Sequence, residues 1–230
     1  LDFVGVPEAV KSNQVAFVLT NPAMYVRLAR QQGAEKIATL RNRANGSIMD
    51  RYGGVIFTRA DAEGIREIAD LRGRSLAGVH VSSLGGYLMA RRQLREAGIN
   101  PDGDLAGLQF AGTHDAVVQA VLTGRADAGT VRTDTLERMV AEGRIKPGSY
   151  RVLGERSEEV GFPLALSTRL YSEWPLARTA ETPPALARKV ARALQAMPPD
   201  AAAAQQGFDA RFLSAKVDVE RHRVFTAPLR

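Results

Sequence analysis

Short apolar runs alternate with segments of helical periodicity along most of this chain, and many of the helical segments end at a glycine. The runs VAFVL (15–19) and VIF (55–57) are typical of buried strands, whereas AMYVRLARQQG (23–33) is typical of a helix that stops at its glycine. Strands that alternate with helices favour parallel sheets covered by helices. The pattern therefore predicts an α/β fold with mostly parallel sheets.

The alternation continues to residue 197. We predict further strands at 74–81, 105–112, 126–131, 151–154 and 163–168. We predict further helices at 64–73, 87–98, 113–124, 133–143 and 183–197. The Ala-rich stretch 198–207 is interpreted as a linker or helix, and the last residues, 217–230, as a tail or linker without a clear period.

Composition excludes several classes of function. The 230 residues are enough for one large domain or two lobes, and the absence of cysteine removes disulfides and thiol catalysis. Three histidines without a nearby cluster of acids make a metal site unexpected. The net charge is +6, but the arginines are scattered and only 6% of residues are aromatic, which argues against nucleic-acid binding. No apolar run is long enough to span a membrane.

The stretch VSSLGGY joins a predicted strand to a predicted helix. The first backbone N–H groups of a helix lack partners within it, so the Ser83 hydroxyl and the N–H groups of Leu84 and Gly85 could hold an anion. The alternative is a helix cap at a corner where strand and helix pack closely. The residues alone leave both interpretations open.

Two further junctions have the same form. His114 opens the helix after FAG, where it could donate to an oxyanion or be a partly buried histidine satisfied by the backbone. Arg132, Thr133 and Asp134 follow the strand ADAGTV; Arg132 could hold an oxyanion by two parallel hydrogen bonds or be a surface residue beside a capping threonine. Because ligands bind at the carboxyl ends of strands in open α/β sheets, the three junctions together favour a binding site.

No catalytic set is recognisable in the sequence. There is no nucleophile elbow, no motif of paired carboxylates and no GxGxxG sequence. A small-molecule transferase is the remaining enzyme alternative, and it lacks any nucleophile with a base. We predict that this segment is not an enzyme and needs no cofactor or metal.

Five stretches together resemble the phosphate, phosphite and phosphonate substrate-binding proteins. They are FVLTNPAMYV, RYGGVIFTRAD, IADLRGRSLAGVHVSSLGGYLMA, FAGTHDAVVQAVLTGRADAGTVRTDTLERM and STRLYSEWPLA. The sequences of these stretches are more similar to the members fused to sensor histidine kinases, of which the tetrathionate sensors are one kind. The resemblance covers most of residues 1–197.

The resemblance implies a type II periplasmic-binding-protein fold, in which two α/β lobes hold a ligand in the cleft between them. Lobe I would comprise residues 1–69 and 156–230, and lobe II residues 70–155. The family's first strand and helix would be missing from this chain. Hinges of this kind let two lobes close around a ligand.

The resemblance also implies which residues bind the ligand. The family's anion-binding loop corresponds to Ser83, Leu84 and Gly85, its cleft histidine to His114, and a tyrosine before the crossover strand to Tyr52. Thr20 and Asn21 lie where the first lobe meets the cleft. The set that we predict on both grounds is Thr20, Asn21, Tyr52, Ser83, Leu84, Gly85, His114, Arg132, Thr133 and Asp134.

Departures from the family pattern indicate the kind of ligand. Aminophosphonate binders hold the ligand's ammonium with two carboxylates; one matches Asp134, but the other aligns with Phe162, and an asparagine becomes Arg132. Such changes make the site more positive, and one charge at 4 Å is worth roughly 4 kcal/mol at an effective dielectric constant near 20. We therefore expect an oxyanion without a cationic tail: a sulfur oxyanion, phosphate, phosphite or simple phosphonate.

Two functions fit this resemblance. The first is the periplasmic sensor domain of a two-component histidine kinase anchored in the inner membrane, whose partner is the transmembrane and kinase module of the same chain. The second is a free-standing binding protein that delivers the anion to the permease of an ABC transporter. In the first, the ligand can bias signalling only through its different affinities for the open and closed forms.

Overall fold

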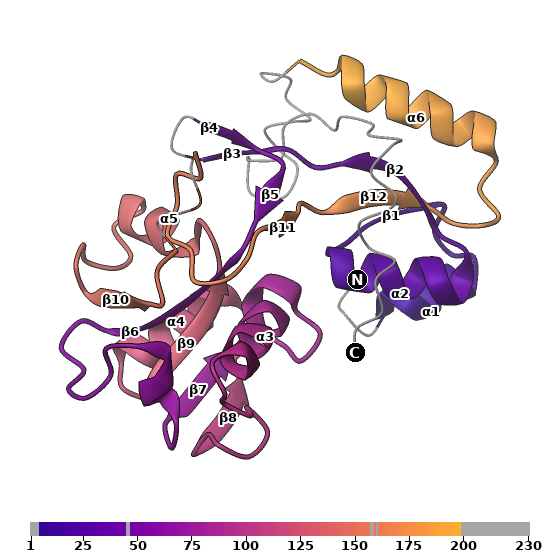
Figure 1. Cartoon of the computed structure of the whole chain (residues 1–230). Helices are drawn as coiled ribbons and strands as arrows, with labels where there is room; N and C mark the ends of the chain where they lie inside the picture. The colour runs from indigo at the N-terminus through magenta and orange to yellow at the C-terminus, as the bar shows by residue number, and fades with distance from the viewer. Residues whose placement is uncertain (1–4, 45–46, 157–158, 160, 199–230) are drawn as a thin grey trace. The chain divides into compact units, whose positions relative to one another are not determined.

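The computed structural model describes residues 5–44, 47–156, 159 and 161–198, and the chain divides into two compact units (Figure 1). Unit 1 comprises Leu1–Arg51 and Ser172–Arg230, and unit 2 comprises Tyr52–Tyr171. Residues 52–69 and 156–171, which the sequence analysis assigned to lobe I, fall within unit 2. The chain crosses between the units at β5 (Arg51–Tyr52) and β11 (Tyr171–Ser172), which form a two-stranded sheet.

Unit 2 is built on a five-stranded sheet with the order β10-β6-β9-β7-β8. Its strands are β6 (Gly54–Arg59), β7 (Ser75–Gly78), β8 (Gly107–Phe110), β9 (Ala128–Arg132) and β10 (Tyr150–Leu153). β7 is parallel to β8 and β9, but β6 is antiparallel to β9 and β10. The sheet is therefore mixed rather than mostly parallel. Between β6 and β7 the described chain has only the short 3-10 helix η1 (Ile68–Leu71), not the α-helix that usually connects parallel strands.

Helices cover both faces of this sheet. They are α3 (Met89–Glu96), α4 (His114–Leu122) and α5 (Thr135–Ala141), and a π-helical turn, η2 (Leu84–Leu88), leads into α3. Alternate residues of β6 point to opposite faces: Val55 and Phe57 pack in the apolar cluster of α4 and α5, whereas Ile56 packs in the cluster that contains Leu94 of α3. Burial on both faces explains why residues 55–57 of β6 are all apolar.

Unit 1 contains a smaller antiparallel sheet with the order β1-β12-β2. Its elements are α1 (Gly5–Lys11), β1 (Phe17–Leu19), α2 (Pro22–Gln32), β2 (Glu35–Thr39), β12 (Pro175–Arg178) and α6 (Pro184–Ala196), with a hairpin of β3 (Asn42–Ala44) and β4 (Ser47–Met49). Val10, Met24, Leu28 and Ala177 form its apolar core. Figure 1 shows α6 beside β2, with α1 and α2 across the sheet from it.

The predicted helices at 23–33, 87–98, 113–124, 133–143 and 183–197 are confirmed within a few residues at their ends. The predicted strand at 163–168 is wrong. Ser167 donates its N–H to the Gly54 carbonyl, but its hydroxyl, and not its carbonyl, accepts from the Ile56 N–H, so no ladder forms along β6. The predicted helix at 64–73 is reduced to η1. The tail 217–230 and residues 199–207 of the Ala-rich stretch lie outside the described residues.

Candidate functional site

Eight of the ten predicted site residues belong to unit 2, near the ends of β7, β8 and β9 and the point where β5 leads into β6. The Arg132 guanidinium lies over the Tyr52 ring, 4.7 Å from its centroid. The backbone N–H of Arg132 donates to His114 Nδ1 at 3.2 Å. Gly85 packs against both Tyr52 and Arg132. Three strand-to-helix junctions that are distant in sequence therefore meet in one place, which we call the strand-end cluster: Tyr52, Ser83, Leu84, Gly85, His114, Arg132, Thr133 and Asp134.

The glycines of VSSLGGY are needed for close packing. A Cβ on Gly85 would lie 2.8 Å from Tyr52 Cε2 and 2.9 Å from Arg132 Cβ, and a Cβ on Gly86 would lie 2.4 Å from Val79 Cγ2. Real side chains do not approach so closely, so only glycine fits these positions without a shift. This is the packing corner that the sequence analysis kept as an alternative to the anion cradle.

The same turn also presents backbone donors. Ser83 caps it in the expected way, since its Oγ accepts from the Gly86 N–H at 3.2 Å. The Leu88 N–H donates to the Ser83 carbonyl, five residues back, which is the π-helical pattern. Leu84 and Gly85 are buried, and their N–H groups find no acceptor among the described residues. Buried N–H groups normally have a partner, so these two donors are available to a ligand.

His114 is held as a neutral donor. Because its Nδ1 accepts from the Arg132 N–H, the proton of the neutral ring is on Nε2. Burial, together with the positive charge of Arg132, lowers the pKa of His114 to about 3. The side chain can therefore offer one hydrogen bond from Nε2 at neutral pH, but no positive charge.

Arg132 supplies the positive charge of the cluster, and its position is fixed. Its Nε donates to the Thr133 carbonyl at 3.4 Å and lies 3.8 Å from Asp134 Oδ1, in addition to the contact with the Tyr52 ring. The Arg132 and Asp134 side chains are only 16% and 19% exposed, so their mutual attraction is less screened than that of a surface pair. Asp134 thus offsets part of the charge that Arg132 brings.

Thr133 and Asp134 shape the turn after β9. Thr133 exchanges two bonds with Gly53: its N–H donates to the Gly53 carbonyl at 3.0 Å, and its Oγ1 accepts from the Gly53 N–H at 3.3 Å. Asp134 has a left-handed backbone, with φ of 78°. A non-glycine residue in this region stores strain of about 1 kcal/mol, which the surrounding structure must sustain.

Asp115, next to His114, has a structural role that the sequence did not reveal. Its carboxylate forms ion pairs with both Arg138 of α5 and Arg144. Burial alone would raise its pKa, but hydrogen bonds from the two guanidinium groups hold the pKa of Asp115 below its usual value. These pairs tie the first turn of α4, which carries His114, to α5. Arg138 lies 23 residues after Asp115 in the sequence, and periodicity does not detect a pair at such a separation.

Thr20 and Asn21 belong to unit 1. Asn21 caps α2, because its Oδ1 accepts from the Met24 N–H at 3.0 Å, and its Nδ2 is buried without an acceptor among the described residues. Thr20 is buried, and its N–H donates to the Pro175 carbonyl at 3.3 Å. Their part in ligand binding stays a prediction.

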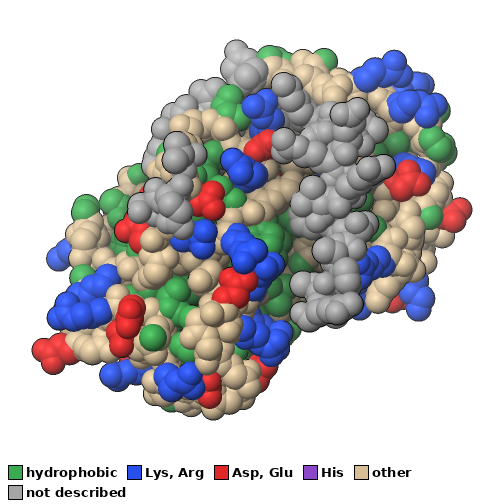
Figure 2. All heavy atoms as spheres, viewed as in Figure 1, with side chains coloured by type: hydrophobic (Ala, Val, Ile, Leu, Met, Phe, Trp, Pro, Cys, Tyr) green, Lys and Arg blue, Asp and Glu red, His purple; other side chains and the backbone are tan. Residues whose placement is uncertain are grey.

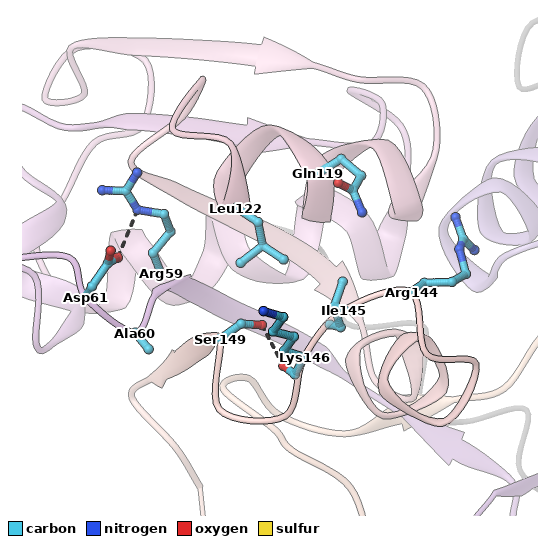
Figure 3. A pocket seen from close by; sticks show the side chains of 9 residues that line it. All are labelled: Arg59, Ala60, Asp61, Gln119, Leu122, Arg144, Ile145, Lys146 and Ser149. Carbon is cyan, nitrogen blue, oxygen red and sulfur yellow. Dashed lines mark hydrogen bonds and ion pairs between the residues drawn. The ribbon is translucent and has the colours of Figure 1, made fainter.

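A cavity of about 450 Å³ in unit 2 contains none of the predicted site residues (Figure 3). It is lined by Arg59, Ala60, Asp61, Gln119, Leu122, Arg144, Ile145, Lys146 and Ser149. Gln119 and Leu122 come from the carboxyl-terminal half of α4, whereas His114 opens that helix. The cavity therefore lies at the other end of α4 from the strand-end cluster. Within the described part of the chain there is no group of residues that could hold a metal ion, and no helix that could span a membrane.

Comparison with known families agrees with this arrangement. A family model described as "ABC transporter, phosphonate, periplasmic substrate-binding protein" matches residues 1–218. The chain belongs to this family. Its members are binding proteins rather than enzymes, as the sequence analysis expected for this segment.

Two curated relatives of this family member differ in function. The chain is 35% identical over 196 residues to the tetrathionate sensor histidine kinase TtrS of Salmonella typhimurium, covering 84% of this chain and 32% of that protein. It is 26% identical over 182 residues to the phosphate-import protein PhnD of Mycolicibacterium smegmatis, covering 75% of this chain and 56% of that protein. The chain thus spans about a third of the length of the first relative and just over half of the length of the second.

Solved structures confirm the predicted fold. The binding-protein component of an ABC phosphonate transporter from Pseudomonas aeruginosa superposes with a TM-score of 0.74 at 15% identity, covering 94% of this chain and 68% of that one. PhnD1 of Prochlorococcus marinus, solved in complex with methylphosphonate, superposes with a TM-score of 0.69 at 14% identity, covering 94% of this chain and 78% of that one. The fold is that of the type II periplasmic binding proteins, with the mixed sheet described above.

Proposed function

We propose that this chain is the periplasmic ligand-binding domain of a sensor histidine kinase anchored in the inner membrane, and that it binds a small oxyanion. The observation that carries the proposal is the turn at Leu84 and Gly85: both residues are buried, their N–H groups lack acceptors among the described residues, and Gly85 packs against Tyr52 and Arg132. Preorganised donors of this kind favour a negatively charged ligand.

The balance of charge in the cluster supports a bare anion. His114 is neutral, and Asp134 offsets part of the charge of Arg132, so the ligand would be held by aimed N–H donors and one guanidinium. Phe162 gives no carboxylate that could pair with an ammonium group. Sulfur oxyanions, phosphate, phosphite and simple phosphonates fit these donors, and aminophosphonates do not.

Titration calorimetry of the purified domain tests the ligand class. The panel contains tetrathionate, thiosulfate, sulfate, phosphate, phosphite, methylphosphonate and 2-aminoethylphosphonate. We expect at least one bare anion to bind more tightly than the aminophosphonate. Preference for the aminophosphonate over every bare anion would refute the assignment.

The second candidate is a free-standing binding protein of a phosphate- or phosphonate-type ABC transporter. It is supported by the 26% identity to a phosphate-import protein. The reading frame of the full gene separates the two: a transmembrane segment and kinase in the same frame support the sensor, whereas a permease encoded beside a short frame supports the transporter.

A further inference from the structure

Helix α6 of unit 1 carries an exposed group of three cations, which we call the α6 basic face: Arg188, Lys189 and Arg192. The thirteen residues of α6 include no Asp or Glu, and no carboxylate of the described residues lies within 4 Å of the three cations. Figure 2 shows Lys and Arg side chains gathered where Figure 1 places α6. The face is therefore a region of uncompensated positive charge.

The packing of α6 leaves most of its circumference open. Only Ala187 and Ala191, one turn apart, are buried in this helix, so it meets the rest of unit 1 along a narrow line of small side chains. Leu186 is 43% exposed, and Val190 and Leu194 continue its stripe at intervals of four residues, both half-buried. The open surface of the helix thus combines cations with an exposed apolar edge.

The rest of unit 1 reinforces this charge. The two segments of unit 1 contain 16 Lys and Arg against 10 Asp and Glu, so unit 1 accounts for the net charge of +6 of the whole chain. Unit 2 contains 15 of each. A field of one sign across a surface attracts an extended anionic partner more than a single small ion.

We propose that the α6 basic face binds the surface of an anionic phospholipid bilayer. A basic amphipathic helix with an exposed leucine is the pattern of helices that lie at a membrane interface. Long Lys and Arg side chains need no fixed partner geometry, and lipid phosphates can move to meet them. An acidic protein surface, in contrast, would have to supply carboxylates in matching places.

Co-sedimentation of the whole chain with vesicles tests the proposal. We expect binding to vesicles that mix phosphatidylglycerol with phosphatidylcholine, and little binding to phosphatidylcholine alone. Each cation removed should weaken binding about fivefold, so the combined variant Arg188→Gln, Lys189→Gln, Arg192→Gln should lose roughly a hundredfold. Glutamine suits an exposed helix as well as arginine and lysine do, so the variant should fold.

A matched variant removes the same charge from unit 2: Arg66→Gln, Arg95→Gln and Arg125→Gln, all exposed. It should keep most of the vesicle affinity. The proposal is overturned if the α6 variant binds as the original chain does, if the matched variant loses as much, or if phosphatidylcholine vesicles bind equally well. Binding to polyglutamate but not to anionic vesicles would overturn it in favour of an acidic protein partner. Because the oxyanion donors lie in unit 2, calorimetry with the anion panel on the α6 variant reports separately on the proposed function.

Discussion

Unit 2 carries as many acidic as basic residues, whereas unit 1 carries all of the excess positive charge, yet the strand-end cluster lies in unit 2. In unit 2 most arginines of the described chain are paired, as Arg138 and Arg144 are with Asp115. In unit 1 the cations of α6 have no such carboxylates among the described residues. Under the proposed function, a few aimed donors hold the small anion, and the excess charge of unit 1 is not needed for this.

Filling the space at Gly85 should have the largest effect. In Gly85→Ala the new Cβ would lie within 3 Å of Tyr52 Cε2 and Arg132 Cβ, so we expect a loss of about 2 kcal/mol in the free energy of unfolding and of most anion binding. Urea unfolding and calorimetry measure the two losses. Gly107→Ala is the control, because nothing lies within 4 Å of its Cβ position. Equal stability of the two variants would contradict the packing described for η2.

The neutral state of His114 should make unit 2 sensitive to acid. The unfolded chain takes up a proton at His114 near pH 6.5 and the folded chain only near a pKa of about 3, so the free energy of unfolding should fall as the pH drops through this window. The contribution lost between neutral pH and pH 5 is about 2 kcal/mol. Urea unfolding across this range, compared with His114→Asn, measures it. An identical pH dependence in the variant would show that His114 is not held neutral by the fold.

Removing the one charge of unit 2 that we expect to face the ligand should weaken oxyanion binding more than removing several charges from unit 1. Arg132→Ala should cost more than about 1.5 kcal/mol of binding free energy, the value of a hydrogen bond to a charged group. Arg125→Ala, an exposed arginine of the same unit, is the control and should cost less than about 0.5 kcal/mol. Unchanged affinity in Arg132→Ala would remove this residue from the site.

The smallest effect is expected for charges outside the strand-end cluster. The triple glutamine variant of α6 and the cavity variant Lys146→Ala should each change anion affinity by less than about 0.5 kcal/mol, because water and salt screen the charges of exposed side chains that make no direct contact with the ligand. Calorimetry with the best anion of the panel measures both. A large loss in the α6 variant would mean that the excess charge of unit 1 takes part in ligand binding.

The helices were predictable because their signals are local. Asn21 and Thr113 lie directly before α2 and α4 and cap them, and the apolar residues of α4 repeat at helical intervals. The segment PLALST resembles a strand just as strongly, but it pairs with β6 partly through the hydroxyls of Ser167 and Thr168. Periodicity measures burial, and it does not say whether main-chain or side-chain atoms make the hydrogen bonds.

The candidate site was predictable only as a set of positions. The rule that strand ends meet at one edge of a sheet, together with the family resemblance, brought Ser83, His114 and Arg132 into one hypothesis. It did not reveal the contact of Arg132 with the Tyr52 ring, or the ion pairs of Asp115 that hold the start of α4. Those contacts join residues 23 to 80 positions apart, and neither propensity nor spacing carries information over such distances.

The sequence by itself determined the α/β class, the positions of the main helices and the presence of donors where strands become helices, because each depends on neighbouring residues. Only the tertiary structure decided the direction of β6, the neutral state of His114 and the place of the excess charge on one unit. These depend on which distant segments pack together, and burial and electrostatic interactions act between neighbours in space.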